Sequence, residues 1–401
     1  MKKHILIVAD GRSPTTQSWI KNILSSGYQV SLISSFNCEK PKGLAHFHVL
    51  PIAFSRFSTG AKTNGKKIGN VSGIKKLVKR FTPLLQKFRY ILGPLSILKY
   101  AREYQKLVAE ITPDLVHSLR IPYEGMLASY TPKDIPLILA IWGNDLTLHA
   151  KGSLLMRFFT KRSLTRADGL TSDTRRDLSL AVDWGLNSAS PVLWVPGSGG
   201  LDLDAVEKTQ DFNNYFDIPK DTLWVVNPRG LRPGSVHQEV FFESIPEVLK
   251  SRQDISFICP SLEGQPQAQA WIGQFEIEEG VFLLPKLPQS QLWALFKKSA
   301  LFVSPSSHDG TPNTLLEAMA CGCLPILGDI ESAREWIEHG RNGLLVNPRD
   351  PHALAQAILN GLDQPELRHH AAIINQEIIK KLASLEVTRP LIEKFYSQFI
   401  A

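Results

Sequence analysis

The sequence predicts an α/β protein with two Rossmann-like, doubly wound domains that face each other across a cleft. Short β-rich apolar runs alternate with longer helical patterns, which is typical of parallel sheets covered by helices. This alternation starts again in the second half of the chain, and 401 residues exceed what one hydrophobic core usually organises. Because ligands of such domains bind at the carboxyl ends of the strands, we expect the functional site there.

The expected strands form two sets, one in each half of the chain. The first set comprises His4–Val8, Gln29–Ile33, Phe47–Pro51, Asp114–His117, Leu137–Trp142, Gly169–Ser172 and Val192–Val195. The second comprises Leu223–Asn227, Ile255–Cys259, Val281–Leu284, Leu301–Ser304, Pro325–Leu327 and Leu344–Val346. Helices are expected between them, for example at Val240–Lys250 and Gln289–Lys298.

The glycine-rich segment Pro196–Val206 follows the last strand of the first set and predicts an interdomain hinge. The predicted domains are therefore residues 1–197 and 198–385. Residues 386–401 contain apolar side chains at helical spacing and predict a final helix that can pack back on the first domain.

Composition excludes several classes of protein. The hydrophobic fraction of 43% and charged fraction of 21% indicate an ordinary globular chain. No uncharged apolar stretch approaches the ~20 residues that span a bilayer, and the amino terminus lacks a signal-peptide core. The four cysteines show no spacing typical of a disulfide framework, which favours a cytoplasmic protein. A dinucleotide-binding dehydrogenase is not expected, because the first strand is followed by DGRSPTT, which lacks the glycines of its G-x-G-x-x-G motif.

Positive charge is concentrated in one segment. Residues 40–102 hold fourteen lysines and arginines and no acidic residue, whereas the whole chain carries a net charge of +7. Between Ile74 and Leu92 the apolar residues share one helical face, so residues 56–92 are predicted either to contact an anionic membrane surface or to form an ordinary surface helix. Pro83 would kink or divide this helix. Nucleic acid is not expected as a partner, because no zinc-finger spacing or aromatic RNA-binding signature is present.

The segment Ser304–Gly322 carries the most chemistry. It follows an expected strand and runs into a helix, with Thr311 suited to the N-cap and Pro312 to the first helical position. The unpaired amide groups and the helix dipole predict an anion site that fits a phosphate or diphosphate. Asp309 and Glu317 lie eight positions apart, so both carboxylates can face one ligand. Taken alone, the pair has a second interpretation, in which Asp309 caps its own loop backbone and Glu317 is a solvated residue of the helix.

Residues 309–330 read DGTPNTLLEAMACGCLPILGDI, and residues 334–358 read REWIEHGRNGLLVNPRDPHALAQAI. This sequence resembles the nucleotide-sugar glycosyltransferases of the GT-B fold, specifically the retaining family four, whose signature places two acidic residues, separated by seven residues, before AMACG. The resemblance covers most of the chain, since VPGSGGLD, PDLVHSL and WGNDL also look like family segments. It implies that residues 1–197 form the acceptor-side domain and residues 198–385 the nucleotide-sugar domain.

The resemblance also implies roles for individual residues. Arg229 would neutralise the leaving diphosphate, Glu317 would bind the ribose hydroxyls and Asp309 would meet the donor sugar. The remaining donor-binding residues would be Arg232, Lys286, Leu287, Gly310, Thr311, Asn313 and Thr314, and the acceptor-side residues His117, Asn144 and Asp145.

Four departures from the family pattern stand out. The first acid is Asp309 rather than glutamate, Pro312 replaces a glycine, and the lysine expected about five residues after Arg229 is absent, with Arg232 the nearest basic substitute. Trp142 stands where many members carry histidine.

The predicted function is retaining transfer of a sugar from a nucleotide-diphosphate sugar to a glycan or lipid-linked acceptor, in cell-surface polysaccharide or glycolipid synthesis. No cofactor and no metal are expected, and the location is cytoplasmic or peripheral on the cytoplasmic face of the membrane. Two alternatives stay open: a catalytically silent glycan or nucleotide-sugar binding protein of the same fold, and a phosphorylase or epimerase acting on sugar nucleotides.

Overall fold

The computed structural model describes residues 2–53, 82–212 and 216–400. Two compact units are present. The N-terminal unit contains Met1–Asp173, Asp177–Gly199 and Arg389–Ala401, and the C-terminal unit contains Thr174–Arg176 and Gly200–Thr388. The main division between them falls after Gly199, inside the glycine-rich segment.

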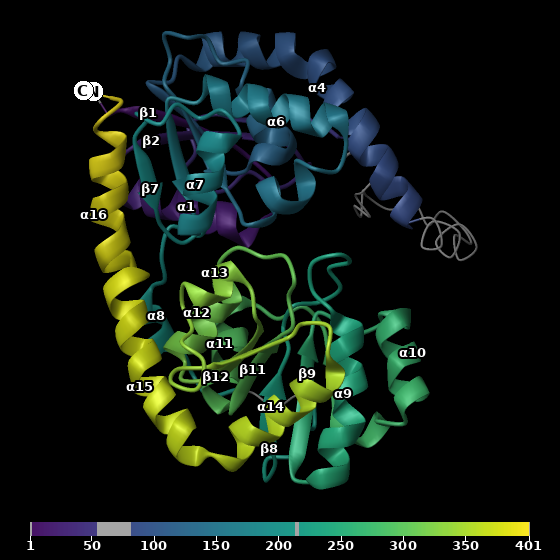
Figure 1. Cartoon of the computed structure of the whole chain (residues 1–401). Coiled ribbons are helices and arrows are strands. Elements are labelled where there is room, and N and C mark those ends of the chain that lie inside the picture. The colour runs from purple at the N-terminus through teal and green to yellow at the C-terminus, as the bar shows by residue number, and fades with distance from the viewer. Residues whose placement is uncertain (1, 54–81, 213–215, 401) are drawn as a thin grey trace, which may run out of the picture. The chain divides into compact units, whose positions relative to one another are not determined.

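The N-terminal unit is built on a parallel seven-stranded sheet of order β3-β2-β1-β4-β5-β6-β7 (Figure 1). Every strand expected in the first half of the sequence is present, and the doubly wound fold class is confirmed. The order reverses between β1 and β4, which is the switch point where open α/β sheets bind ligands. The strands are β1 (His4–Ala9), β2 (Gln29–Ser34), β3 (Phe47–Val49), β4 (Leu115–Ser118), β5 (Leu137–Ile141), β6 (Gly169–Ser172) and β7 (Val192–Trp194).

Alternating side chains of this sheet reach two hydrophobic cores. Leu6 and Val8 pack with the helices on one face, whereas Ile5 and Ile7 pack with those on the other. The first face is covered by α4 (Thr82–Ile111), α5 (Met126–Ala128), α6 (Leu154–Arg166) and α7 (Arg175–Asp183), and the second by α1 (Pro14–Ser25) and the end of α16 (Leu385–Tyr396). The last helix of the chain is therefore part of the N-terminal core.

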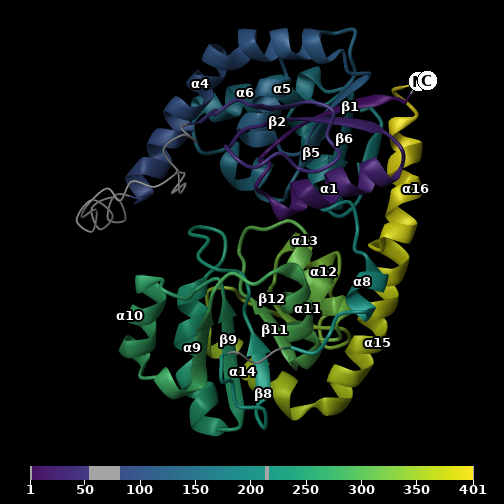
Figure 2. The ribbon, with the colours of Figure 1, turned by 180° about the vertical axis from the view of Figure 1, so that it is seen from behind.

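The C-terminal unit repeats this design with a parallel six-stranded sheet of order β10-β9-β8-β11-β12-β13 (Figure 2). Its switch point lies between β8 and β11. Leu301 and Val303 point into the core with α9 and α14, and Phe302 packs on Phe296 of α11 on the other face. The strands are β8 (Leu223–Val226), β9 (Ile255–Pro260), β10 (Val281–Leu284), β11 (Leu301–Ser304), β12 (Leu324–Gly328) and β13 (Leu344–Val346). The helices are α8 (Leu203–Glu207), α9 (Gln238–Ser251), α10 (Pro266–Phe275), α11 (Gln289–Lys298), α12 (Asn313–Ala320), α13 (Glu331–Arg334), α14 (Pro351–Asp363) and α15 (Pro365–Leu382).

The start of the C-terminal unit requires a glycine. Gly200 has a φ of +119°, and a Cβ atom there would lie 2.2 Å from Oγ1 of Thr388. Any side chain at this position would therefore be strained and would displace Thr388 near the start of α16.

The predicted amphipathic segment lies largely outside the described residues, because residues 54–81 are not described. Its end forms the start of α4. Pro83 is the second residue of this helix, where a proline is tolerated. The expected kink or division at Pro83 also involves residues before Thr82, which lie outside the described residues. Among the residues that the structure describes, no helix has the length and apolar character needed to cross a membrane.

Candidate functional site

The predicted donor-site residues converge at the switch point of the C-terminal sheet. Arg229 follows β8 and Asp309 follows β11, and these two strands are neighbours in the sheet. Parallel strands end at the same edge of a sheet, so residues 80 positions apart meet there.

Arg229 is a buried cation with two side-chain partners. Only 7% of the residue is exposed. Its Nη2 forms an ion pair with Oδ2 of Asp309, and its Nη1 donates to Oγ1 of Thr314 at 3.2 Å. The Nε atom is also buried and finds no acceptor among the described residues. An unsatisfied buried donor is costly, so this guanidinium is suited to receive a further anionic ligand.

Asp309 is held tightly in this site. Its Oδ1 accepts from the amide of Gly310 at 3.1 Å, and its Oδ2 accepts from Oγ of Ser306 at 3.3 Å in addition to the pair with Arg229. The carboxylate therefore fixes the guanidinium in place. The sequence suggested separate contacts of Arg229 and Asp309 with the ligand and gave no sign of this pair.

The helix that follows begins one residue later than expected. Its N-cap is Pro312, with an extended ψ of 128°, and α12 starts at Asn313. Thr311 does not cap the helix, because its Oγ1 accepts a hydrogen bond of 2.8 Å from Nε1 of Trp336. The expected N-cap is therefore wrong by one position. Asn313 and Thr314 still occupy the first turn, where amide groups and the helix dipole favour an anion.

Glu317 lies one turn further along α12 and is also buried, with 6% of the residue exposed. Its Oε1 accepts from Nε2 of Gln289 at 2.8 Å. Burial raises the pKa of Glu317 to about 7, against the opposing effect of the Gln289 hydrogen bond. The carboxylate thus changes charge near neutral pH.

The other donor-side residues surround these three. Lys286 and Leu287 follow β10 and come just before Gln289, the first residue of α11. They lie near Glu317 because Gln289 donates a hydrogen bond to it. Lys286 is exposed and Leu287 is half-buried. Arg232 is exposed, and its Nε donates to the carbonyl oxygen of Arg229 at 3.3 Å. It therefore lies beside Arg229.

His117 does not lie on the wall of a pocket, contrary to the acceptor-side expectation. It is fully buried, and burial lowers its pKa to about 3. Its Nδ1 lies 2.8 Å from the hydroxyl of Tyr396, which in turn accepts from Nε1 of Trp19 at 3.0 Å. Since Tyr396 belongs to α16, the return of the last helix places this histidine in the core.

Asp145 is fully buried, and Asn144 beside it is half-buried. The Asp145 carboxylate accepts from the amides of Ile121 and Trp142, both at 3.2 Å, and from Nε of Arg120 at 3.3 Å. Burial raises its pKa to about 6, although Arg120 opposes this shift. Asp145 therefore orients the Arg120 side chain and the loop after β5.

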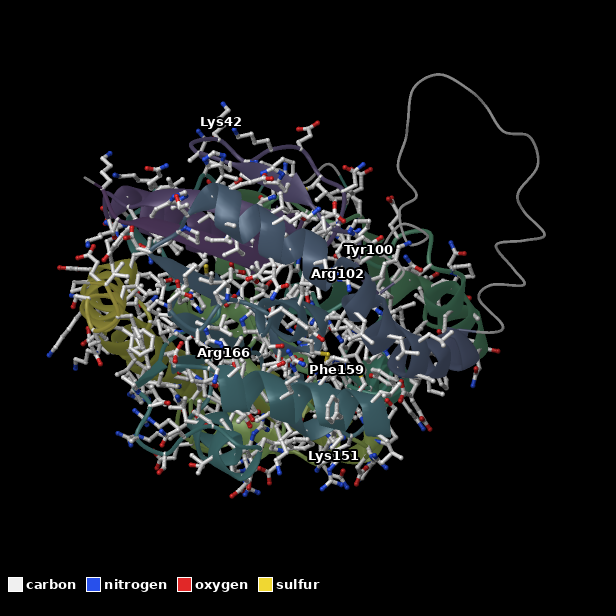
Figure 3. The ribbon with its side chains drawn as sticks, turned by 90° about the horizontal axis from the view of Figure 1, so that it is seen from above. Lys42, Tyr100, Arg102, Lys151, Phe159 and Arg166 are labelled. Atoms are coloured by element: carbon white, nitrogen blue, oxygen red, sulfur yellow. The ribbon has the colours of Figure 1, made fainter. Side chains whose placement is uncertain are left out.

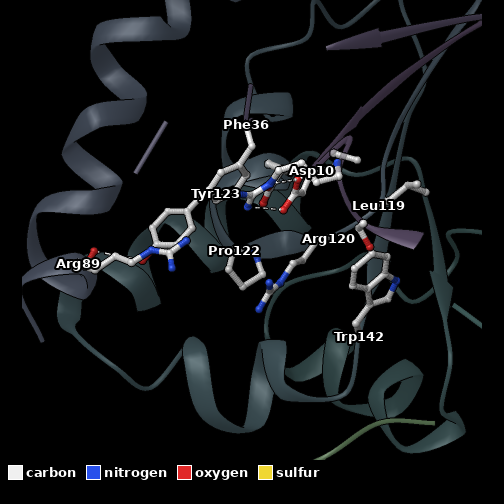
Figure 4. Close-up of a pocket in the computed structure, with 12 residues that line it drawn as sticks. Asp10, Phe36, Arg89, Leu119, Arg120, Pro122, Tyr123 and Trp142 are labelled. Atoms are coloured by element: carbon white, nitrogen blue, oxygen red, sulfur yellow. Dashed lines mark hydrogen bonds and ion pairs between the residues drawn. The ribbon is translucent and has the colours of Figure 1, made fainter. Parts of the chain in front are cut away.

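A cavity of about 290 Å³ lies at the switch point of the N-terminal sheet (Figure 4). Residues directly after four neighbouring strands line it: Asp10 after β1, Phe36 after β2, Arg120 after β4 and Trp142 after β5. Sequence reasoning did not select Asp10, Phe36 or Arg120 as site residues. The sequence signal that could have selected them is their position just beyond the carboxyl ends of expected strands. Further lining residues include Arg12, Arg89, Pro122, Tyr123 and Glu124.

Comparisons with known proteins agree with this architecture. A family model described as glycosyl transferases group 1 matches residues 236–377, and one described as glycosyl transferase 4-like matches residues 84–174. An uncharacterized glycosyltransferase from Methanocaldococcus jannaschii is 23% identical over 317 residues, which cover 77% of this chain and 82% of that protein.

Two solved structures share the whole fold. Sucrose-phosphate synthase from Thermosynechococcus elongatus superposes with a TM-score of 0.74 at 14% identity, covering 99% of both chains. Anabaena HepE, solved in complex with UDP and glucose, gives a TM-score of 0.71 at 14% identity over 99% of this chain and 100% of that one. With both family models matched, the chain belongs to the group 1 glycosyltransferases of the GT-B fold.

Proposed function

We propose that this glycosyltransferase transfers a sugar, with retention of anomeric configuration, from a nucleoside-diphosphate sugar to a glycan or lipid-linked acceptor of the cell surface. The observation that carries the donor assignment is the buried Arg229 beside the first turn of α12, with Glu317 one turn further on. The UDP bound in Anabaena HepE supports a nucleotide donor.

In the proposed reaction the leaving diphosphate gains negative charge, and Arg229 with the amide groups at the start of α12 stabilises that charge. Groups held in place before the reaction are effective because they need not reorganise, and one such donor typically lowers the barrier by ~3 to 4 kcal/mol. Asp309 and Thr314 supply this preorganisation by fixing the guanidinium. In this proposal the arginine and helix end act without a divalent metal.

A donor screen tests the proposal. The full chain is expected to melt at higher temperature with one class among UDP-, GDP- and ADP-sugars, because a ligand that binds the folded state stabilises it by mass action. The same donor should be hydrolysed slowly by the purified protein. Stabilisation without any hydrolysis or transfer would favour the catalytically silent alternative, and no stabilisation by any donor would contradict the proposal.

The structure also supports a membrane-facing surface, which we call the α4–α6 surface. The two helices pack together, and Oγ of Ser153, just before α6, donates to the carbonyl oxygen of Tyr90 on α4 at 2.7 Å. Large apolar side chains are exposed on both helices: Ile91, Leu92, Leu95, Leu98, Leu154 and Phe158, with Leu154 85% exposed. Exposed basic residues accompany them, namely Lys99, Arg102, Lys151, Arg157 and Lys161, and Arg102 and Lys151 are labelled in Figure 3.

Apolar side chains flanked by lysine and arginine suit the interface of an anionic bilayer. We therefore expect the full chain to sediment with vesicles containing phosphatidylglycerol and to stay in solution with neutral vesicles. Changing both Leu154 and Phe158 to serine should weaken this binding by about tenfold or more. The control is Ile373→Ser on α15, which removes another exposed apolar side chain, 51% exposed, elsewhere and should leave binding unchanged. Equal sedimentation of all three proteins would contradict the membrane proposal.

A further inference from the structure

The cavity of the N-terminal unit has features of a site for a charged small molecule. Its volume of about 290 Å³ lies at the lower end of the range of ligand pockets, which is ~300 to 1,000 Å³. It opens at the sheet's switch point, on the side of the carboxyl ends of the strands. Three arginines, Arg12, Arg89 and Arg120, line this one small space together with aromatic rings.

Two of the arginines are oriented by carboxylates and neighbouring rings. Arg12 forms a two-pronged pair with Asp10, from Nε and Nη2, with both distances 3.0 Å, and its guanidinium lies 3.5 Å from the centre of the Phe36 ring. Arg120 is fixed by Asp145 through Nε and by His149, whose Nε2 lies 3.0 Å from Nη2. Both side chains remain more than one third exposed, so solvent and ligands can reach them.

The imidazole of His149 adds no positive charge to this group. Burial and the nearby Arg120 lower the pKa of His149 to about 3, so the neutral ring accepts the hydrogen bond from Arg120. Glu124, the second carboxylate on the wall, is buried and accepts a hydrogen bond from Ser35, and burial raises its pKa. Three guanidinium groups thus line the cavity together with two carboxylates, of which that of Asp10 is paired with Arg12.

Tyr123 gives a second, independent sign of a functional wall. It is not glycine, yet its φ is +71° with a ψ of −53°, a conformation that costs free energy. Arg89 lies with its guanidinium 5.0 Å from the centre of this ring, and the Tyr123 hydroxyl donates to the carbonyl oxygen of Arg89 at 3.1 Å (Figure 4). Gly93 makes room for the ring, since a Cβ atom there would lie 2.6 Å from it. The fold thus holds a tyrosine with a strained backbone and an arginine at the cavity.

We propose that this cavity binds an acceptor sugar through a phosphate or carboxylate group, with Arg12, Arg89 and Arg120 as the ligands of that group. Planar guanidinium groups bind both oxyanions with two parallel hydrogen bonds, and the aromatic side chains offer flat apolar faces to a sugar ring. This inference rests on the proposed function, because it names the acceptor class of the proposed transfer.

The test is direct binding to the full chain without donor, measured by calorimetry. The probes are glucose, galactose and mannose, their 6-phosphates, their uronic acids and inorganic phosphate. At least one charged sugar is expected to bind about tenfold or more tightly than its neutral parent. Preference for the 6-phosphates or for the uronic acids identifies which oxyanion is recognised. Equal binding of charged and neutral sugars, or no binding of any charged sugar, overturns the proposal, and inorganic phosphate binding as tightly as a sugar phosphate overturns its sugar part.

Variants connect the charge preference to this cavity. R89Q and R120Q should each reduce the affinity for the charged sugar about tenfold and leave the binding of UDP unchanged. Arg89 is exposed on α4, so R89Q tests the site even if R120Q disturbs the loop held by Asp145. The matched control is R252Q, which breaks a similar two-pronged pair with Asp254, two residues away, in the other unit. Charged-sugar affinity that is unchanged in R89Q and R120Q overturns the assignment. Failure of UDP, GDP and ADP alike to bind would contradict the proposed donor and leave this result standing.

Discussion

Replacing Arg229 with alanine is expected to lower kcat by a factor of about 10² to 10³ and to weaken donor binding by much less. The physical reason is that the diphosphate gains charge on departure, so the guanidinium interacts more strongly with the transition state than with the bound donor. The measurement is initial-rate kinetics together with the dissociation constant of the donor from calorimetry. Equal losses in kcat and in donor affinity would instead indicate uniform binding.

The buried ion pair complicates this variant and supplies its control. Removing Arg229 alone leaves the carboxylate of Asp309 without its cation, and breaking a buried pair in this way typically costs ~3 to 5 kcal/mol of folding free energy. The double variant R229Q/D309N replaces both charges and should keep most of the stability while turnover remains low. Recovery of turnover along with stability in the double variant would show that Arg229 acts only through the fold.

Replacing Glu317 with alanine is expected to abolish measurable donor binding, because a carboxylate that accepts hydrogen bonds from two ribose hydroxyls contributes ~1.5 to 3 kcal/mol for each. The pKa of about 7 in the free protein adds a pH dependence. Below that pH the carboxyl group is protonated and must lose its proton to accept both bonds, so donor affinity should fall as pH decreases from 8 to 6. Calorimetry at several pH values checks this. Unchanged donor affinity in the alanine variant would contradict the ribose assignment.

The variant E317Q separates binding from stability. A carboxyl group whose pKa is raised in the folded state binds more protons there than in the unfolded chain, so wild-type stability should fall as pH rises from about 4.5 to 7 and then level off. Glutamine carries no charge that is costly to bury, so E317Q should exceed the wild type in unfolding free energy by about 3 kcal/mol at pH 8. It should nevertheless bind donor poorly, because it lacks the carboxylate. The gap should close near pH 4.5. The exposed E243Q on α9 is the control and should change neither property.

Much of the fold could be predicted because the signals were local. Each apolar run that preceded a polar turn became a strand, and the second set repeated the first. The residues of the donor site were selected through the spacing of Asp309 and Glu317 and the resemblance that accompanied it. Their pattern could not disclose the ion pair from Asp309 to Arg229, because these residues are 80 positions apart and meet only when β8 and β11 become neighbours.

In the N-terminal unit, too, contacts between residues far apart in the chain could not be predicted from the sequence. His117 looked like a strand-end residue facing a ligand, but Tyr396, 279 positions later, packs over it and makes it part of the core. The arginine-lined cavity is assembled from α4 and from the loops after four strands, none of which carries a motif on its own.

The sequence by itself therefore determined the two sheets, the order of their elements and the polar loop that runs into a helix between Asp309 and Glu317, because hydrophobic periodicity and local spacing depend only on positions that are close in the chain. Only the tertiary structure decided which charges pair, which histidine is buried and where the arginines gather. Burial and electrostatic contacts depend on distances in space between residues that lie far apart in the chain, and those distances exist only once the sheets have formed.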